Sequence, residues 1–345
     1  IKPANMVQFY AQQGAEVTSE GFQNPRDIFG GIKDLVQQKP TMRMIAYPFP
    51  DTTFLVLLDP ALIKEMLLNP QNYDKMSKEV ELSALFSKYG LSRTTGDIWK
   101  KHRKVLSSAF QSDYLSLMIP SIEECTKEFL DSFQDKPIRI NAPADIQKIT
   151  SEVISRVFFG LKSRDYTING HSPSEEVSGI LAQMQRFGEK KIRFIFGSKI
   201  LNLWPSYRAT KKRILAFREF FREKINERMA QLAKNPTSNS RRKDFLQIFL
   251  EEREKYSIDT DKTFSDDEIL DEFAVFYLAG KETTSLLISM ALYCYCKYPE
   301  WAKRLETEIE QNIRQNSNLS MEVINSMDTL NAFLKEVLRY YPPAP

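Results

Sequence analysis

The feature that most constrains the fold is a long apolar stretch between residues 269 and 296. Ser265 and Glu268 precede it, three residues apart, in the pattern of a capping box at a helix start. A helix of this length would extend about 40 Å at 1.5 Å per residue. Because it would be apolar on nearly all sides, the sequence predicts a helix over about residues 266–296 that passes through the centre of the protein.

The segment AGKETTS, residues 279–285, interrupts this apolar stretch with a glycine and several polar side chains. Gly280 costs about 1 kcal/mol relative to alanine inside a helix. Ala279 and Thr283 are four residues apart, so they share one helix face and form a small polar notch. Two interpretations are open. In one, the polar residues face solvent and Gly280 is a packing contact; in the other, the helix opens beside a ligand, where Glu282 and Thr283 pass protons.

The rest of the chain predicts a mainly α protein with a small β region. Residues 41–58 contain two β-rich runs around the turn YPFPD, a pattern that predicts a β-hairpin. Apolar residues then recur at helical spacing in most of the chain, most clearly over 108–133, 141–159 and 207–232. Since no repeat, linker or low-complexity tract separates these segments, the sequence predicts a single domain over residues 1–345.

Composition excludes several classes of function. A net charge of +3 from 48 basic and 45 acidic residues provides no excess for nucleic-acid binding. The three cysteines, Cys125, Cys294 and Cys296, form neither a disulfide framework nor a zinc-ligand pattern. We interpret them as reduced side chains in a helical core, in a reducing or cytosol-facing compartment. No run of about eighteen apolar residues indicates a membrane span.

Two further motifs lie on stretches with helical periodicity. In GDIWKKHRKVLSSAF, Trp99 and Arg103 lie four residues apart and share one face of the predicted helix. In NAFLKEVLRYYPPAP, Glu336 and Arg339 lie three apart and predict an ion pair that is common on exposed helices. Taken alone, each motif also fits an ordinary amphipathic surface helix.

Together, and in this order, the three motifs resemble the cytochrome P450 family. The resemblance covers essentially the whole chain and implies the cytochrome P450 fold, mainly α with a small β region. AGKETTS is similar to the family's Ala/Gly-Gly-x-Asp/Glu-Thr-Thr segment, which lies on the helix that crosses the distal face of the haem. The resemblance implies that Ala279 and Gly280 face the porphyrin, and that Glu282 and Thr283 deliver protons to dioxygen at the iron. Lys281 occupies the family's variable position.

The resemblance also assigns roles to the other two motifs. The family's Trp-x-x-x-Arg helix implies that Trp99 and Arg103 bind the haem propionates, and arginine pairs bidentately with carboxylates. The family's Glu-x-x-Arg helix implies that Glu336 and Arg339 brace the core, together with a third partner beyond Pro345.

The iron ligand of the family is a cysteine thiolate, whose electron donation favours O–O cleavage. It lies in a Phe-x-x-Gly-x-x-x-Cys-x-Gly loop, a motif that these 345 residues do not contain. No metal ligand is therefore assigned in this chain, and we expect the axial cysteine after Pro345. Because the chain starts at Ile1 and stops in PPAP, we expect that both ends are cut and that the fold is incomplete at its C-terminal end.

Three functions remain open. The first is a haem-thiolate monooxygenase, present here as a fragment, that inserts one oxygen atom from O2 into a lipophilic substrate. Its cofactor would be haem b (iron protoporphyrin IX), with electrons from NADPH through a flavoprotein reductase or small electron carrier. The second is a haem-free subunit of P450 fold with a structural or interaction role in a larger assembly. The third is a haem-binding sensor or carrier without turnover. The polar notch favours the first, since a scaffold has no physical need for it.

The resemblance further implies surfaces for substrate, membrane and redox partner. The loop at 77–95 is apolar and would contact substrate, whereas KKIRFIFGSKILNLWP, residues 190–205, would lie on a membrane surface. In a typical eukaryotic member that membrane is endoplasmic-reticulum-like and the protein faces the cytosol. Lys100, Lys101 and Lys104 form a basic cluster that would dock an acidic redox partner. The alternatives are core packing for the loop at 77–95, an internal helix and loop for residues 190–205, and a solvated helix face for the lysines.

Overall fold

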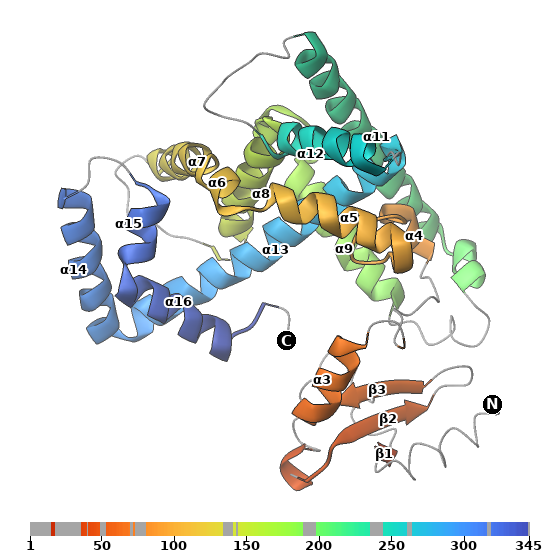
Figure 1. Ribbon diagram of the computed structural model, residues 1–345, viewed down its shortest axis with the longest axis horizontal. Coiled ribbons are helices and arrows are strands. Elements are labelled where there is room, and N and C mark those ends of the chain that lie inside the picture. The colour runs from red at the N-terminus through yellow and green to blue at the C-terminus, as the bar shows by residue number, and fades with distance from the viewer. Residues whose placement is uncertain are drawn as a thin grey trace. The chain divides into compact units, whose positions relative to one another are not determined.

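The part of the chain that the structure describes is mainly helical, with three short strands (Figure 1). The computed structural model describes residues 15–17, 36–39, 41–48, 53–69, 72, 81–133, 141–142, 144–188, 198–234, 244–260, 264–315 and 319–343. The chain divides into two compact units, Ile1–Glu79 with Arg186–Asn202, and Val80–Gln185 with Leu203–Pro345. The expectation of a single domain over residues 1–345 stays a prediction.

The first unit contains a three-stranded sheet. Strand β1 (Ala15–Val17) pairs in parallel with β2 (Met44–Pro48), which pairs antiparallel with β3 (Thr53–Leu57). In the antiparallel pair Met44 lies opposite Leu57, within the stretch where the sequence predicts a hairpin. The parallel strand was not predicted, because three residues carry too short a pattern to indicate a strand.

Helix α3 (Pro60–Leu68) follows the sheet directly. The Asp59 carboxylate caps it by accepting a hydrogen bond from the backbone N–H of Ala61 at 2.7 Å. Pro60 is suited to the first helical position because its missing N–H would have no partner there.

The second unit consists of helices packed around a long central one. The elements after α3 are α4 (Glu81–Phe86), α5 (Gly96–Ala109), α6 (Ser112–Ser116), α7 (Ile119–Asp131), α8 (Ala144–Phe159), η1 (Ser163–Asp165), α9 (Pro173–Gly188), η2 (Ser198–Leu203), α11 (Pro205–Lys234), α12 (Phe245–Thr260), α13 (Asp266–Lys297), α14 (Pro299–Gln315), α15 (Met321–Ser326) and α16 (Asp328–Tyr340). Nearly all of η2 belongs to the first unit.

The stretch with helical spacing over residues 108–133 is helical for most of its length but is divided. The periodic stretch over 108–133 is not one helix, because α5 ends at Ala109 and two shorter helices, α6 and α7, follow. Pro120 lies in the first turn of α7, where its missing N–H is tolerated; further inside a helix it would remove a hydrogen bond. The apolar period continues across the break, so periodicity alone could not reveal it.

The long helix α13 crosses the second unit, with α14 and α16 packed near its C-terminal end (Figure 1). The predicted capping box is confirmed. Ser265 Oγ accepts a hydrogen bond from the Glu268 N–H at 3.2 Å, and Glu268 Oε2 accepts one from the Ser265 N–H at 2.8 Å.

Aromatic rings fill the core between α13 and its neighbours α8, α11 and α12. Phe158 of α8 stacks on Phe245 of α12 with ring centroids 4.4 Å apart. Phe221 of α11 lies 4.9 Å from Phe159 and 5.0 Å from Tyr277 of α13. Rings at these separations add to the burial of apolar area, so this core fixes the position of α13.

Candidate functional site

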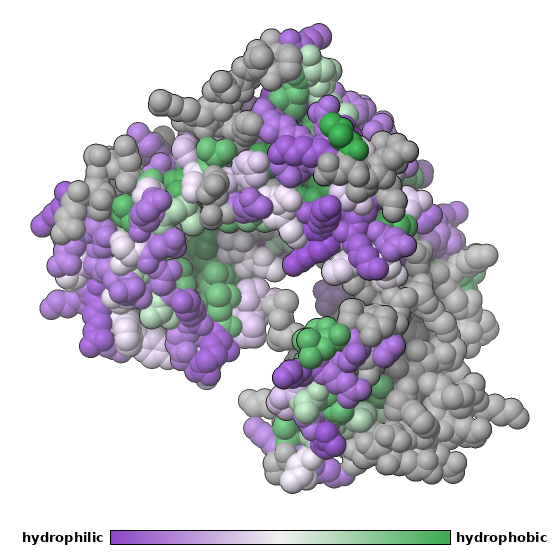
Figure 2. Space-filling view, viewed as in Figure 1, coloured by the Kyte–Doolittle hydropathy of each residue, from purple (hydrophilic) through white to green (hydrophobic). Residues whose placement is uncertain are grey.

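The predicted notch lies on an exposed face of α13. Ala279 and Thr283 are both exposed, and Phe276, Leu287 and Met290 on the same face are partly exposed. Their spacing of three or four residues defines one stripe along the helix. Figure 2 shows hydrophobic side chains along α13 at the floor of a hollow in this face of the protein.

The Thr283 hydroxyl is held in place by its own helix. Its Oγ1 donates a hydrogen bond to the Ala279 carbonyl oxygen at 2.7 Å, a common arrangement for threonine inside helices. The hydroxyl oxygen still has lone pairs that can accept a hydrogen bond. The notch therefore presents an oriented hydroxyl beside a small side chain.

Gly280 lies against helix α8. A Cβ added at this position would lie 2.5 Å from Ile154 Cδ1 and 2.7 Å from Ile154 Cγ1. Non-bonded carbon atoms are essentially never this close. The absence of a Cβ at Gly280 therefore allows α8 and α13 to pack closely. The structure thus provides the packing explanation of Gly280, and its predicted position facing a porphyrin stays a prediction.

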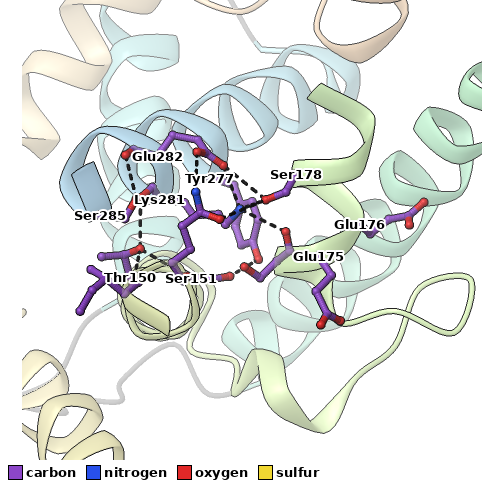
Figure 3. Close-up of polar contacts among 12 residues, drawn as sticks. Thr150, Ser151, Glu175, Glu176, Ser178, Tyr277, Lys281, Glu282 and Ser285 are labelled. Carbon is purple, nitrogen blue, oxygen red and sulfur yellow. Dashed lines mark hydrogen bonds and ion pairs between the residues drawn. The ribbon is translucent and has the colours of Figure 1, made fainter. Parts of the chain in front are cut away.

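The Glu282 carboxylate is held by side chains from α8 and α9 (Figure 3). It accepts hydrogen bonds from Gln147 Nε2 at 2.9 Å and from Ser178 Oγ at 3.4 Å. Lys281 Nζ also donates to it, at 2.9 Å. Among the contacts of the described residues none joins this carboxylate to Thr283, because consecutive helical residues point to different faces.

Lys281 is completely buried, which the sequence analysis did not predict. Its ammonium donates to the Ser174 carbonyl oxygen at 3.1 Å, to Ser178 Oγ, and to Glu282. Burial lowers the pKa of Lys281 below its usual value, and the hydrogen bond and charge of Glu282 oppose this. Its burial could have been inferred from spacing, since Tyr277 lies four residues before it on the face that meets α8.

Hydrogen bonds from α8 complete this buried side of α13 (Figure 3). Thr150 Oγ1 donates to the Lys281 carbonyl oxygen at 3.1 Å, and Ser151 Oγ lies 2.5 Å from the Tyr277 hydroxyl. Burial raises the pKa of Tyr277 to about 12, against the effect of its hydrogen bond to Ser151. The polar side chains of this face are therefore engaged with α8 and α9.

Trp99 and Arg103 lie one turn apart on α5, with Arg103 exposed and Trp99 half-buried. The neighbouring lysines differ from one another. Lys101 is 14% exposed, with Nζ 2.5 Å from Glu268 Oε1 of α13, whereas Lys100 is 72% exposed. Lys104 is exposed and lies over the Tyr256 ring. Lys101 is thus bound inside the fold, which leaves Lys100, Arg103 and Lys104 on the outer face.

His102 is a second buried polar residue that the sequence analysis did not single out. Its side chain is fully buried, and its two ring nitrogens face Glu272 and Glu268 of α13. The motif that contains His102 does not indicate its burial, because both partners lie more than 160 residues further along the chain.

Glu336 and Arg339 form the predicted ion pair on α16. Arg339 Nε and Nη2 each donate to a Glu336 carboxylate oxygen at 2.7 Å, and the guanidinium holds the pKa of Glu336 below its usual value. Both side chains are about two-thirds exposed. They line a groove of about 610 Å³ between α16, the C-terminal end of α13 and the start of α14. Their role in bracing a core stays a prediction.

Cys125 lies on α7, whereas Cys294 and Cys296 lie two residues apart on α13. Cys125 of α7 is buried, and burial raises the pKa of its thiol to about 11, so it is protonated at neutral pH. Cys294 is buried and Cys296 is exposed near the end of α13. Within the described ranges, no cluster of three or more His, Cys, Asp or Glu side chains could hold a metal ion.

The expected substrate and membrane segments are covered only in part. Residues 77–80 and 190–197 lie outside the described ranges. Leu82 and Phe86 are buried, and the Phe86 ring stacks on Phe217 of α11 at 5.6 Å, as the core-packing alternative requires. A search of the described helices finds none with the length and apolar character needed to cross a bilayer.

Sequence comparison identifies the family. The sequence model of the family described as cytochrome P450 matches residues 34–345, which is most of the chain. The chain therefore belongs to the cytochrome P450 family. It is 28% identical over 312 residues to cytochrome P450 CYP72A613 of Trigonella foenum-graecum, covering 85% of this chain and 55% of that protein. It is 26% identical over 300 residues to 7-deoxyloganic acid hydroxylase of Catharanthus roseus, covering 83% and 55%.

Structural comparison confirms the predicted fold. The crystal structure of the cytochrome P450DA heme domain superposes with a TM-score of 0.72 at 18% sequence identity. The match covers 90% of this chain and 65% of that one. The mainly α architecture with a small β region is therefore that of the P450 fold. The chain spans about half the length of the curated relatives that it matches.

Proposed function

We propose that this chain supplies the distal helix and the propionate-binding helix of a haem-thiolate monooxygenase. One observation carries the proposal: Ala279 and Thr283 lie on the exposed face of α13, while the opposite face is buried against α8. A small side chain and an oriented hydroxyl on an apolar stripe suit a flat ring with a reacting molecule above it. Relatives named as a hydroxylase and an oxidase support the same class of reaction.

The residues present fit haem b at the exposed face of α13. Ala279 and Thr283 would lie against the ring, with Gly280 beside them as proposed from the family motif. Trp99 and Arg103 would bind the propionates, and the exposed guanidinium of Arg103 suits a carboxylate. The buried, protonated Cys125 is not suited to bind iron, and the axial thiolate is proposed to follow Pro345. When bound, the haem supplies the activation of O2 that allows one oxygen atom to be inserted into a substrate.

Glu282 and Thr283 are proposed as the acid and alcohol of a proton relay. Thr283 would hold a proton at its Oγ1 on the exposed face, where the Ala279 carbonyl orients the hydroxyl. Glu282 would replenish that proton from the side of α8 and α9, where Gln147 and Lys281 hold its carboxylate. Glu336 and Arg339 are proposed to brace the core of the full-length protein.

Electrons would come from NADPH through a flavoprotein reductase or a small electron carrier. Lys100 and Lys104 on the outer face of α5 would attract an acidic partner, and added salt would slow that encounter. The substrate is proposed to be lipophilic, and the protein to act at a membrane of endoplasmic-reticulum type on its cytosolic side.

The first test is the reduced carbon-monoxide spectrum of the full-length protein. A haem-thiolate band is expected. A protein without haem would favour the alternative, a haem-free P450-fold subunit of a larger assembly. Haem without a thiolate band would instead favour the sensor or carrier.

The second test is the Thr283→Ala variant of the full-length protein. NADPH and O2 consumption should continue, while the fraction that yields oxidised substrate should fall about 10-fold or more, as expected for loss of positioned proton transfer. Thr284→Ala is the matched control, since Thr284 is exposed next to it but outside the proposed relay. Equal coupling in wild type and T283A would contradict the relay.

A further inference from the structure

His102 of α5 lies between two carboxylates of α13. Its imidazole is completely buried. Nδ1 lies 2.5 Å from Oε1 of Glu272, and Nε2 lies 3.0 Å from Oε1 of Glu268. Both distances are those of hydrogen bonds, so the ring joins the two helices through both nitrogens.

These contacts determine the protonation of the ring. Glu268 acts only as an acceptor, because Lys101 Nζ donates to Oε1 and the Ser265 N–H donates to Oε2. His102 Nε2 must therefore carry a proton. A neutral imidazole would then have no proton left at Nδ1, where the Glu272 carboxylate also needs a donor.

The contact between Glu272 and Nδ1 needs a second proton. Its carboxylate is fully buried, and its Oε2 has no hydrogen-bond partner among the described residues. A buried carboxylate that faces an unprotonated nitrogen would be strongly destabilising, whereas an imidazolium supplies both a charge and a donor.

The remaining neighbours of the ring keep water away. Phe264, just before α13, packs on the imidazole with ring centroids 4.8 Å apart. Lys101 Nζ lies 4.5 Å from the same phenylalanine ring, and Tyr256 of α12 lies 6.3 Å from it. Among the described residues, the charged groups in contact with His102 are thus Glu268 and Glu272 from α13; Lys101 of α5 and Tyr256 of α12 lie against Phe264.

We propose that His102 is a buried imidazolium that acts as a positioning residue by fixing α5 on α13. Trp99 and Arg103 lie on the same short helix, so the imidazolium also determines where their side chains are presented. The effect of this imidazolium on haem binding rests on the proposed function. The charge of His102 and the link that it makes between α5 and α13 do not.

Histidine-selective ¹⁵N NMR of the full-length protein tests the charge directly. The signal of His102 is identified by its loss in His102→Asn. At neutral pH both ring nitrogens of His102 should be protonated, and in Glu272→Gln one should lose its proton. A neutral His102 ring in the wild type would overturn the proposal.

Paired substitutions test the link between the helices. His102→Asn leaves Glu272 as a buried unpaired charge, so the unfolding equilibrium constant should rise about 100-fold or more. Adding Glu272→Gln removes that charge and should restore about 10-fold or more of the loss. If the imidazole only fills space, the effects of the two substitutions on the free energy of unfolding will add. In that case the proposal fails.

Haem retention tests the positioning role. In the haem-loaded protein, H102N should lose haem to an acceptor globin about 10-fold faster than wild type, a rate change that corresponds to about 1.4 kcal/mol. Lys100→Gln, on the exposed face of the same helix, should lose it at the wild-type rate. Equal rates in all three proteins would overturn the positioning role. A protein that never holds haem would contradict the proposed function instead, and the NMR and paired-substitution results would still decide the charge of His102.

Discussion

The two faces of α5 carry similar charged side chains in different surroundings. On the exposed face, Asp97 and Lys100 lie 3.5 Å apart and are 90% and 72% exposed. On the inner face, His102 and Lys101 meet carboxylates of α13 at 2.5 to 3.0 Å, largely shielded from water. Water screens the first pair and not the second, so similar residues on one helix contribute very differently to stability.

The same contrast recurs where α11 meets α13. Arg218 pairs with Asp271, which is fully buried, and also donates to the Phe86 carbonyl oxygen at 2.8 Å. One turn further along α11, Arg222 Nη2 lies 3.0 Å from Asp267, and both side chains are more than one-third exposed. The Arg218–Asp271 and Arg222–Asp267 pairs therefore join the same two helices, and they differ in burial.

Arg218→Met should produce the largest effect of the substitutions that test this contrast. It leaves Asp271 charged, buried and without its main partner, which should lower the free energy of unfolding by about 3–5 kcal/mol. The control is Arg222→Met, which should cost no more than about 1 kcal/mol. Chemical denaturation of both variants measures the two values. Equal losses would mean that burial does not separate the two pairs.

The sequence predicted the features that depend on neighbours along the chain. The capping box of Ser265 and Glu268 needs residues only three apart. Gly280 was correctly singled out, but sequence left two explanations open. Only the contact with Ile154, 126 positions earlier in the chain, shows its packing role.

The sequence could not predict features whose partners lie far along the chain. His102 and Lys101 belong to a recognised motif, yet their burial depends on Glu272 and Glu268 of another helix. Lys281 occupies the family's variable position, and the sequence did not reveal that its ammonium donates to Ser174 and Ser178 of α9. A charged residue inside a motif is conventionally expected to face solvent, and the tertiary fold overrides that expectation.

The pH dependence of stability tests the inner face of α5 at Glu268. Burial would raise the pKa of Glu268, but hydrogen bonds from Lys101, the Ser265 backbone and His102 outweigh it and hold the pKa at about 2, below its ordinary value of 4.5. A carboxyl group with a lowered pKa stabilises the fold above its unfolded pKa and loses that contribution as pH falls.

The free energy of unfolding should therefore fall by about 2–3 kcal/mol between pH 4.5 and pH 2 on account of Glu268. Denaturation across this range measures it. In Glu268→Gln this part of the decrease should disappear, whereas in Asp266→Asn, an exposed neighbour, it should remain. An unchanged pH profile in E268Q would remove Glu268 from the explanation.

Gly280→Ala tests, with uncharged residues, the difference between the buried and the exposed face of α13. Alanine favours the helix by about 1 kcal/mol, but its Cβ would meet Ile154, and overpacking of this kind costs about 1–3 kcal/mol. A net loss of about 1 kcal/mol is expected by thermal denaturation. Ile154→Val in the same protein should reduce the penalty by removing the Cδ1 atom. The control is Ala279→Ser on the exposed face, which should leave stability nearly unchanged.

Lys100→Gln should have the smallest effect and completes the comparison on α5. The ammonium of Lys100 lies 3.5 Å from Asp97 in a geometry open to solvent, so the pair should contribute at most about 0.5 kcal/mol. Added salt should leave the difference between K100Q and wild type close to zero, because water already screens the charges. A loss as large as that of H102N would mean that the outer face of α5 is covered in the full-length protein. A small loss, together with slower and less salt-dependent electron transfer, would place Lys100 on a surface kept open for a partner.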